Sequence, residues 1–224
     1  VPITGCGSKE SELTFDKIKC LKFLRNKGVK TAKSISVKKN IEIKSKKIQE
    51  EIGFPCFIKA SKSGSSFGVY KVYNQEEFID CLNSAFQIDD EILVETFIEG
   101  REFSIGVLMY NNKVTVLPIT EIIASNDFFD YEAKYEGKSQ EITPAKIDDK
   151  LKDKLNKISK DIYNIIGLKG FSRSEFIVNK DGIYFLETNT VPGLTSESIL
   201  PQQAQHAGIS LEDLFVNSIY EVIK

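Results

Sequence analysis

The sequence predicts an α+β protein built on antiparallel sheets, and two hairpins and several amphipathic helices support this assignment. One hairpin pairs residues 176–178 with 183–186 across an Asn-x-Asp-Gly break. A second pairs Arg101–Met109 with Val114–Ile119 across two asparagines. Apolar residues at helical spacing predict helices at Gln75–Phe86, Asp149–Ile166 and Ser210–Ile223.

The composition is that of a foldable and slightly acidic chain. Its 224 residues suit one domain or two small ones, and 41% apolar residues can build a core. A net charge of −2 argues against nucleic acid as the main partner, because phosphate binding needs a basic surface. There is no long apolar run and no signal peptide, so we expect a cytoplasmic protein without a membrane span. The chain begins at Val1 rather than methionine, which fits a piece of something longer.

The four cysteines show no metal-binding or redox spacing. Cys6, Cys20, Cys56 and Cys81 contain no CxxC pair, and three of them lie in apolar stretches. We therefore expect reduced, buried thiols rather than a disulfide framework.

The first half of the chain is expected to form helices and a small sheet. Thr14 is the expected N-cap of a helix with Ile18, Leu21 and Leu24 on one face, ended by Gly28. The other predicted elements are strands at Ile35–Val37, Phe54–Ala60, Val69–Val72 and Ile92–Glu95, and a helix at Lys46–Ile52.

A loop rich in glycine and serine, Ser61–Gly68, connects two of these strands. Lys59 precedes it, and a loop with many backbone N–H groups can fold over phosphates beside such a cation. The loop has neither the P-loop pattern nor the Rossmann pattern. An ordinary surface hairpin fits the same residues.

The second half contains one long stretch without periodicity, Ser125–Thr143. Such stretches in compact domains are usually lids or disordered segments, and this one carries tyrosines rather than low-complexity sequence. His206 is the only histidine, and no catalytic role is assigned to it.

The hairpin at 173–189 can form a metal site. With Gly182 as the left-handed residue of a three-residue loop, Asn179 pairs with Ile183. Counting back places Glu175 opposite Glu187 and Arg173 opposite Asn189, all four on one face. Facing carboxylates repel unless a cation lies between them, and Mg²⁺ prefers oxygen ligands. A solvated polar face, or a register shifted by one residue, remains open.

The polar loop after this hairpin, Thr190–Ser198, is rich in turn residues and small side chains. Its backbone N–H groups lie in sequence next to acids and an arginine, so the loop can hold an anion.

The string FLETNTVPGLTSESILPQQAQHAGIS resembles the C-terminal signature of D-alanine–D-alanine ligases, which belong to the ATP-grasp superfamily. FDKIKCLKFLRNKGV resembles the family's MDK helix, and FFDYEAKY resembles its FYDYEAKY loop. The glycine-rich loop is similar to the family's flap, although Ala60 replaces a proline and Ser63 an acid.

This resemblance implies an ATP-grasp fold of two antiparallel-sheet subdomains with ATP bound between them. Residues 1–33 are then a linking helix that follows an N-terminal domain absent from this sequence. Residues 34–100 form the central subdomain, and 101–224 form the C-terminal one, with a mobile loop at 125–143 and the metal hairpin at 173–189. The resemblance also implies a homodimer of the full-length protein.

The resemblance further implies a role for each matching residue. Lys17, Lys59 and Lys134 approach the phosphates, Glu95, Thr96 and Ile98 form the adenine hinge, and Glu102 holds the ribose. Glu175, Glu187 and Asn189 bind Mg²⁺ (two ions, replaceable by Mn²⁺), although the family usually has aspartate at position 175. Arg173 and the Gly193 N–H stabilise an oxyanion, Tyr135 closes the loop toward Ser65, and Ser198 and Ile199 bind the carboxylate of the second D-alanine.

The implied reaction is the ATP-dependent joining of two D-alanines through a D-alanyl phosphate. Two alternatives stay open: an ATP-binding fragment that is inactive without its N-terminal domain, and a ligase for another amino or hydroxy acid. The EAKY sequence at Glu132–Tyr135 argues against D-lactate.

Overall fold

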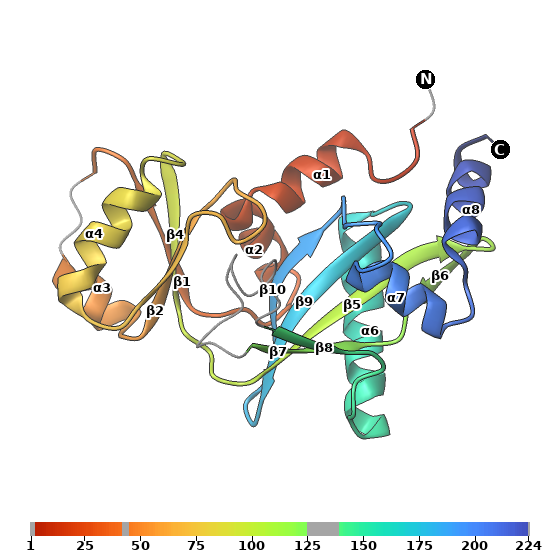
Figure 1. The fold of residues 1–224 in the computed structure, drawn as a ribbon. Coiled ribbons are helices and arrows are strands. Elements are labelled where there is room, and N and C mark those ends of the chain that lie inside the picture. Colours follow the sequence, from red (N-terminus) through yellow and green to blue (C-terminus); the bar gives the residue numbers. More distant parts are fainter. Residues whose placement is uncertain (1–2, 42–44, 125–138, 224) are drawn as a thin grey trace. The chain divides into compact units, whose positions relative to one another are not determined.

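A computed structural model describes residues 3–41, 45–124 and 139–223 of the protein (Figure 1). They form two compact units. One is drawn from Phe15–Glu99 and Ala124–Ser139, and we call it the small-sheet unit. The other is drawn from Val1–Thr14, Gly100–Ile123 and Gln140–Lys224, and we call it the large-sheet unit. The boundary after Thr14 falls inside the stretch 1–33 that the resemblance treats as one linking segment.

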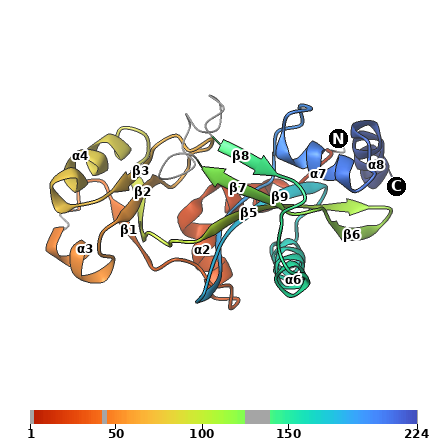
Figure 2. The same cartoon turned by 60° about the horizontal axis from the view of Figure 1, so that its bottom comes forward.

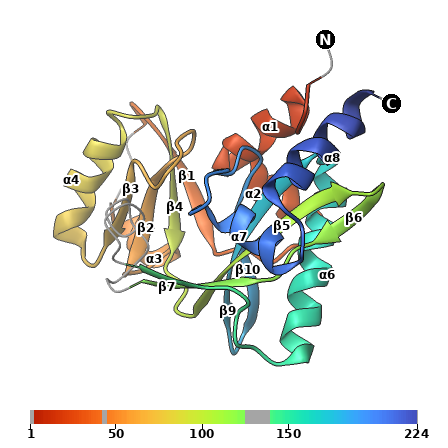
Figure 3. The same ribbon diagram turned by 45° about the vertical axis from the view of Figure 1, so that its right-hand side comes forward.

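The small-sheet unit contains a four-stranded sheet in the order β1-β4-β2-β3 with antiparallel pairs. Its elements are α2 (Lys17–Arg25), β1 (Ser34–Lys38), α3 (Ser45–Glu51), β2 (Cys56–Ala60), β3 (Val69–Val72), α4 (Gln75–Ala85) and β4 (Glu91–Thr96). One face of the sheet carries buried apolar side chains, including Ile58 and Val94, which pack against Ile48 of α3 and Phe78 of α4. Figures 1 and 3 show both helices on this face. The opposite face carries the charged and aromatic side chains described below.

The helix expected after Thr14 begins two residues later than predicted. Asp16 is the N-cap of α2, and its side chain accepts a hydrogen bond from the Lys19 N–H. Thr14 instead lies in a helix that the sequence analysis missed, α1 (Ser8–Phe15), where its hydroxyl donates to the Ser11 carbonyl. Both residue types cap helices well, so sequence alone did not separate them. Gly28 has a positive φ of 84° beyond the helix end, as predicted.

The large-sheet unit contains a six-stranded sheet in the order β10-β9-β5-β7-β8, with β6 paired to β5. Its strands are β5 (Arg101–Tyr110), β6 (Lys113–Val116), β7 (Thr120–Ala124), β8 (Ser139–Ile142), β9 (Phe171–Asn179) and β10 (Gly182–Asn189). Its helices besides α1 are α6 (Asp149–Ile166), α7 (Ile199–His206) and α8 (Leu211–Ile223). Figure 2 shows α7 and α8 on one face of the sheet and α6 on the other.

Most predicted helices are confirmed, whereas two short strands were missed. The helix α6 has the predicted bounds, with Asp148 as N-cap and Gly167 in the left-handed region at its end. No strand was predicted at Thr120–Ala124, which form β7, and the strand predicted at Val114–Ile119 ends at Val116 as β6. The prediction also assigned 139–142, which form β8, to the long stretch 125–143. Residues 125–138 of that stretch lie outside the described residues.

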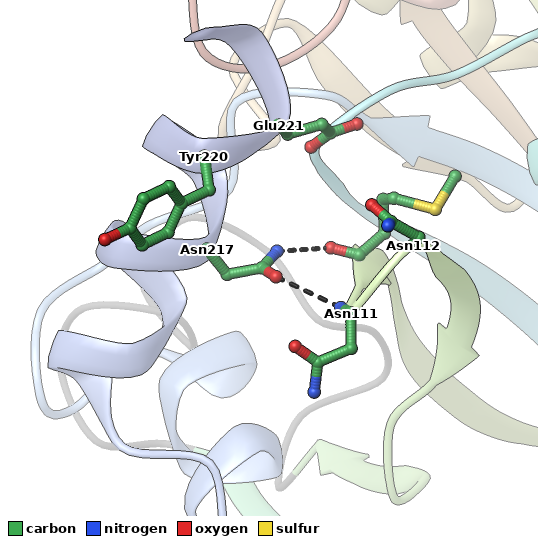
Figure 4. A pocket seen from close by; sticks show the side chains of 6 residues that line it. Asn111, Asn112, Asn217, Tyr220 and Glu221 are labelled. Carbon is green, nitrogen blue, oxygen red and sulfur yellow. Dashed lines mark hydrogen bonds between the residues drawn. The ribbon is translucent and has the colours of Figure 1, made fainter. Parts of the chain in front are cut away.

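The last helix is fixed by one asparagine and leaves an apolar face exposed. Asn217 donates to the Met109 carbonyl at 2.6 Å and accepts from the Asn111 N–H at 3.1 Å (Figure 4). Beside these bonds lies a pocket of about 150 Å³ lined by Met109, Asn111, Asn112, Asn217, Tyr220 and Glu221.

The exposed apolar side chains of α8 include Phe215, Ile219, Tyr220 and Ile223. None of the described helices is both long enough and apolar enough to cross a membrane.

Candidate active site

The face of the small sheet opposite α3 and α4 carries the predicted phosphate-binding lysine. Lys59 on β2 forms an ion pair with Glu95 on β4, and the side chains are only 15% and 6% exposed. The Lys59 ammonium also lies over the Phe57 ring, 5.1 Å from its centroid. A buried cation needs such a partner, because water no longer solvates its charge. The structure therefore brings together two residues that the sequence analysis predicted separately.

Aromatic rings and a second lysine extend this face. Phe57 and Phe97 lie with ring centroids 6.0 Å apart, and the Lys71 ammonium lies 4.2 Å from the Phe97 centroid. Lys71 pairs with Phe57 across β3 and β2, so both side chains point to the same face. Lys71 was not predicted as a site residue, although its alternation with the buried Val72 places it on this face.

The predicted adenine hinge follows β4. The Thr96 N–H donates to the Lys33 carbonyl at 2.9 Å, and the Phe97 N–H donates to the Pro55 carbonyl at 3.3 Å. The Thr96 hydroxyl donates to the Ile52 carbonyl at 3.1 Å. These bonds fix the hinge backbone on the small sheet. The predicted adenine contacts of Glu95, Thr96 and Ile98 stay a prediction.

The glycine-rich loop Ser61–Gly68 is a closed turn rather than an extended strand connection. The Phe67 N–H donates to the Gly64 carbonyl at 2.9 Å, and Ser65 and Ser66 between them have φ values of 52° and 58°. Two positive φ values in a hydrogen-bonded turn are the signature of a type I′ turn, and such values are uncommon outside glycine. Non-glycine residues held in this region cluster at ligand-binding sites. Ser65 is also exposed.

Lys17 reaches this loop from the start of α2. Its ammonium donates to the Ser63 carbonyl at 2.6 Å. The contact joins residues 46 positions apart and places the lysine of the predicted MDK-like helix at the predicted flap.

The acidic hairpin of the large sheet has the predicted register at its functional end. Glu187 on β10 lies opposite Glu175 on β9, and Asn189 lies opposite Arg173. Glu102 on β5 is opposite Ile177, two residues from Glu175, so it points to the same face of the sheet. Five predicted residues from three strands thus share one face.

The register near the turn differs from the prediction. Asn179 pairs with Gly182 rather than with Ile183, which leaves only Lys180 and Asp181 in the turn. A β-bulge between Phe185 and Glu187 then adds one residue to β10 and brings Glu187 opposite Glu175. The carboxylate pairing is therefore correct, although the turn from which it was counted was assigned wrongly.

The charges on this face fit a hard cation. Arg173 donates to Glu175 Oε1 at 2.9 Å, and both side chains are largely buried. The buried Arg173 Nε has no hydrogen-bond partner among the described residues, so this guanidinium can still donate to a ligand. Within the described ranges, no group of three or more His, Cys, Asp or Glu side chains is arranged to hold a metal ion by itself. The predicted Mg²⁺ ligands are two carboxylates and an amide, and this oxygen set is one that Mg²⁺ accepts.

The loop after β10 is tightly folded around Ser198. The Asn189 Oδ1 accepts from the Val191 N–H at 2.9 Å and starts the loop. A Cβ on Gly193 would lie 2.6 Å from Ser198 Oγ, so a larger residue there would force the Ser198 side chain to move. Ser198 is the N-cap of α7 but makes no side-chain cap bond, and its hydroxyl instead pairs with that of Thr195 at 2.9 Å. Ile199 is the first residue of α7, where backbone N–H groups lack partners within the helix.

Gln203 connects α7 to the acidic face and was missed by the sequence analysis. Its Nε2 donates to the Ser104 carbonyl at 2.8 Å and to Thr120 Oγ1 at 2.9 Å. Its Oε1 accepts from the Gly106 N–H at 3.0 Å. Because Ser104 is the β5 partner of Glu175, this fully buried amide fixes the middle of α7 relative to the acids. In the sequence, Gln203 could have been noticed as the one polar residue on the buried face of α7.

The structure does not report on two of the predicted site residues, and the single histidine was assigned no role. Lys134 and Tyr135 lie outside the described residues. His206 is exposed, and its Nδ1 lies 2.9 Å from the Gln202 carbonyl of its own helix.

A family model described as "D-ala D-ala ligase C-terminus" matches residues 23–220. The D-alanine–D-alanine ligase of Flavobacterium johnsoniae is 51% identical over 98% of this chain and 68% of its own length. That of Christiangramia forsetii is 49% identical over 98% of this chain and 67% of its own length.

Solved structures give the same match. The VanG D-Ala:D-Ser ligase from Enterococcus faecalis is 34% identical with a TM-score of 0.86, over 98% of this chain and 64% of that chain. The D-alanine–D-alanine ligase from Bacillus anthracis complexed with ATP is 28% identical with a TM-score of 0.84, over 99% of this chain and 70% of that chain. The chain thus spans about two thirds of the length of the proteins that it matches.

Proposed function

The chain belongs to the D-alanine–D-alanine ligase family and has the ATP-grasp fold, and we propose that it carries the ATP- and metal-binding part of a ligase joining two D-alanines. The reaction forms a C–N bond, releases ADP and phosphate, and supplies a peptidoglycan precursor. In the full-length protein, which we propose to be a homodimer, an N-terminal domain binds the ammonium group of the first D-alanine.

The pairing of Glu175 with Glu187 carries this proposal. It faces two carboxylates on one side of the sheet, beside Asn189 and Arg173. When bound there, Mg²⁺ neutralises charge on the phosphate oxygens of ATP. Such an arrangement suits phosphoryl transfer, in which catalysis depends on positioning and on stabilisation of charge.

The proposed chemistry has two steps. The carboxylate oxygen of the first D-alanine attacks the γ-phosphorus, and the bond to the β,γ-bridging oxygen breaks to release ADP. The amine of the second D-alanine then attacks the carbonyl carbon of the resulting D-alanyl phosphate. The tetrahedral intermediate collapses with loss of inorganic phosphate and of the amine proton. No protein nucleophile is required.

The small-sheet unit is proposed to hold the nucleotide. The Thr96 carbonyl and Ile98 bind adenine, while Lys17 and Lys59 place positive charge along the phosphates. Ser65 presents the tip of the glycine-rich loop to them. We propose that Lys134 and Tyr135 complete this binding during turnover.

The large-sheet unit is proposed to hold the ribose, the metal and the second substrate. Glu102 accepts hydrogen bonds from the ribose hydroxyls. Arg173 and the Gly193 N–H donate to the oxygen that gains charge in the tetrahedral intermediate, where fixed donors are most effective. Ser198 and the Ile199 N–H at the start of α7 bind the carboxylate of the second D-alanine, since a helix N-terminus favours an anion.

A second candidate function is ligation of D-alanine to D-serine. The observation that favours it is the 34% identity to a D-Ala:D-Ser ligase over 98% of this chain. The two functions differ only in the amine substrate, so one assay with D-alanine, D-serine and D-lactate separates them. We expect D-alanine to be used best and D-lactate not at all.

The test is phosphate release from MgATP by the 224-residue chain, with and without D-alanine. The full-length Flavobacterium johnsoniae enzyme serves as the active control. D-alanine-dependent release supports a ligase unit that is complete enough for catalysis. Binding of MgATP without release indicates an ATP-binding fragment. Failure to bind MgATP at all contradicts the proposal.

A further inference from the structure

Two buried side chains join the start of α2 to the root of the glycine-rich loop. The Ser61 hydroxyl donates to Asp16 Oδ1 at 2.9 Å, and Asp16 Oδ1 also accepts from the Lys19 N–H at 3.1 Å. Asp16 is 1% exposed and Ser61 is 0% exposed. The second carboxylate oxygen, Oδ2, is buried and lies 3.4 Å from the Lys19 ammonium.

Backbone bonds reinforce this junction. The Lys17 N–H donates to the Ser61 carbonyl at 3.0 Å, and the Ile18 N–H donates to the Ser61 hydroxyl at 3.3 Å. The first two N–H groups of the helix are therefore satisfied by a single residue of the loop. Burial raises the pKa of Asp16, but the hydrogen bonds from Lys19 and Ser61 and the charge of Lys19 outweigh this effect. The pKa lies below its ordinary value, so the carboxylate is ionised at neutral pH.

Ser61 lies where the loop leaves the sheet. Its N–H donates to the Glu91 carbonyl at 3.1 Å, and the neighbouring Ala60 N–H closes the loop by donating to the Gly68 carbonyl at 2.9 Å. Within the loop, the Ser63 carbonyl accepts from the Lys17 ammonium at 2.6 Å. The loop is consequently held by α2 at two points, its root and its middle.

Asp16 differs in this respect from other helix caps of the protein. Asn74 caps α4 by accepting from Glu76 and Glu77, and Asp148 caps α6 by accepting from Leu151. Those bonds remain within one helix and its cap. An acid that served only α2 would not need to lie buried against a loop 45 residues away.

We propose that Asp16 and Ser61 are positioning residues for the phosphates of ATP: they fix the glycine-rich loop and Lys17 to each other, so that both meet the phosphates in one geometry. The inference rests on the proposed nucleotide-binding function. Without the junction, the loop and Lys17 would have to be ordered again on each binding event, and this ordering costs affinity. Adenine, which binds at the hinge, would not be affected.

The test measures the affinity of the 224-residue chain for MgATP, MgADP and adenosine by calorimetry. Asp16→Ala and Ser61→Ala should each weaken MgATP binding about tenfold and change adenosine binding less than about twofold. Asp16→Asn and Ser61→Thr keep the acceptor and the donor, so both should stay within about threefold of the wild type. The double variant should be no worse than either single variant, because both remove one junction.

Asn74→Ala is the matched control, because it removes a helix cap of the same unit without touching the loop. It should lower stability and leave the ATP-to-adenosine affinity ratio unchanged. An equal loss of MgATP and adenosine affinity in Asp16→Ala, or a wild-type ratio in Ser61→Ala, overturns the positioning role. If Asp16→Ala does not fold, the Ser61→Ala and Ser61→Thr pair decides alone. A wild-type chain that does not bind MgATP overturns the proposed function, and this inference with it.

Discussion

The two units hold their charged side chains in different ways. In the large-sheet unit, Glu175, Glu187 and Asn189 lie on one face because strand register places them there. In the small-sheet unit, Lys59 is held by its ion pair with Glu95, and Lys17 is held by a carbonyl of the glycine-rich loop. The acids are thus positioned by the backbone, whereas the lysines depend on other side chains and on a loop.

This difference has a functional consequence. Metal ligands must keep their spacing within tenths of an ångström, and adjacent strands of a sheet provide that rigidity. The lysines proposed to contact the phosphates have long side chains, so their positions depend on the side chain or loop that holds each of them. We therefore expect substitutions on the large sheet to affect chemistry with little loss of stability, and those on the small sheet to affect both.

The largest expected effect is that of Glu187→Gln on the large sheet. It removes one charge from the proposed metal site while keeping the shape of the side chain. We expect MgATP turnover to fall at least about 100-fold, since metal stabilisation of transferring phosphate is worth several kcal/mol. The circular dichroism spectrum and the melting temperature should remain close to those of the wild type.

Asp181→Asn is the matched control for this change. It makes the same kind of substitution at the exposed turn of the same hairpin and should leave turnover unchanged. Normal turnover in Glu187→Gln would show that Glu187 is not a metal ligand.

Positions set by strand register could be predicted from the sequence more readily than positions set by tertiary contacts. The predicted pairing of Glu175 with Glu187 is correct, although the turn from which it was counted is wrong. The error was one residue at Asn179, and the bulge before Glu187 compensated for it. No pattern in the sequence marks that bulge, so the correct pairing was partly fortunate.

Contacts that depend on tertiary packing were not predictable. The hydrogen bond from Lys17 to Ser63 and that from Ser61 to Asp16 each join residues more than 40 positions apart. The prediction of Thr14 as the cap is wrong, because the folded chain places Asp16, which meets Ser61, at the start of α2. Family resemblance identified Lys17, but it did not reveal what holds the lysine in place.

The next effect in size concerns the ion pair of the small sheet. Lys59→Met leaves Glu95 buried without its cation, and removal of one partner of a buried pair typically costs about 3–5 kcal/mol. We expect a loss near the lower end of this range in the free energy of unfolding, because the Lys59 side chain is 15% exposed. Urea denaturation measures the loss, with the exposed Lys62→Met as control.

A double variant separates stability from function at this pair. Lys59→Met with Glu95→Leu removes both charges and should recover most of the stability, since a buried pair can be replaced by apolar residues. Binding of MgATP should stay weak in the double variant. Recovery of MgATP affinity together with stability would show that Lys59 acts only on the fold.

A smaller effect is expected from Gln203→Leu, which tests whether the large sheet also relies on side chains. The change leaves the buried Gly106 N–H without its acceptor, and such a loss costs about 1–3 kcal/mol. Because Gln203 fixes α7, the KM for the second D-alanine should rise about tenfold, while MgATP affinity is unchanged. Gln205→Leu, at an exposed position of the same helix, is the control. Equal KM values would mean that α7 keeps its position without this amide.

The smallest expected effect is a change in the labelling rate of Cys56. This rate measures local opening of the small-sheet unit. Burial and, to a lesser extent, the nearby Cys81 raise the pKa of the Cys56 thiol to about 11. At pH 8 only about one in a thousand of these thiols is then ionised, and the fully buried sulfur reacts only after local opening. In a chain with Cys6, Cys20 and Cys81 replaced by serine, labelling by a disulfide reagent should be slow. It should accelerate in Lys59→Met, which destabilises this unit, and not in Gln203→Leu, which acts on the other. Faster labelling in both variants would mean that the two units open together. The difference between the two units would then apply to the native state and not to its opening.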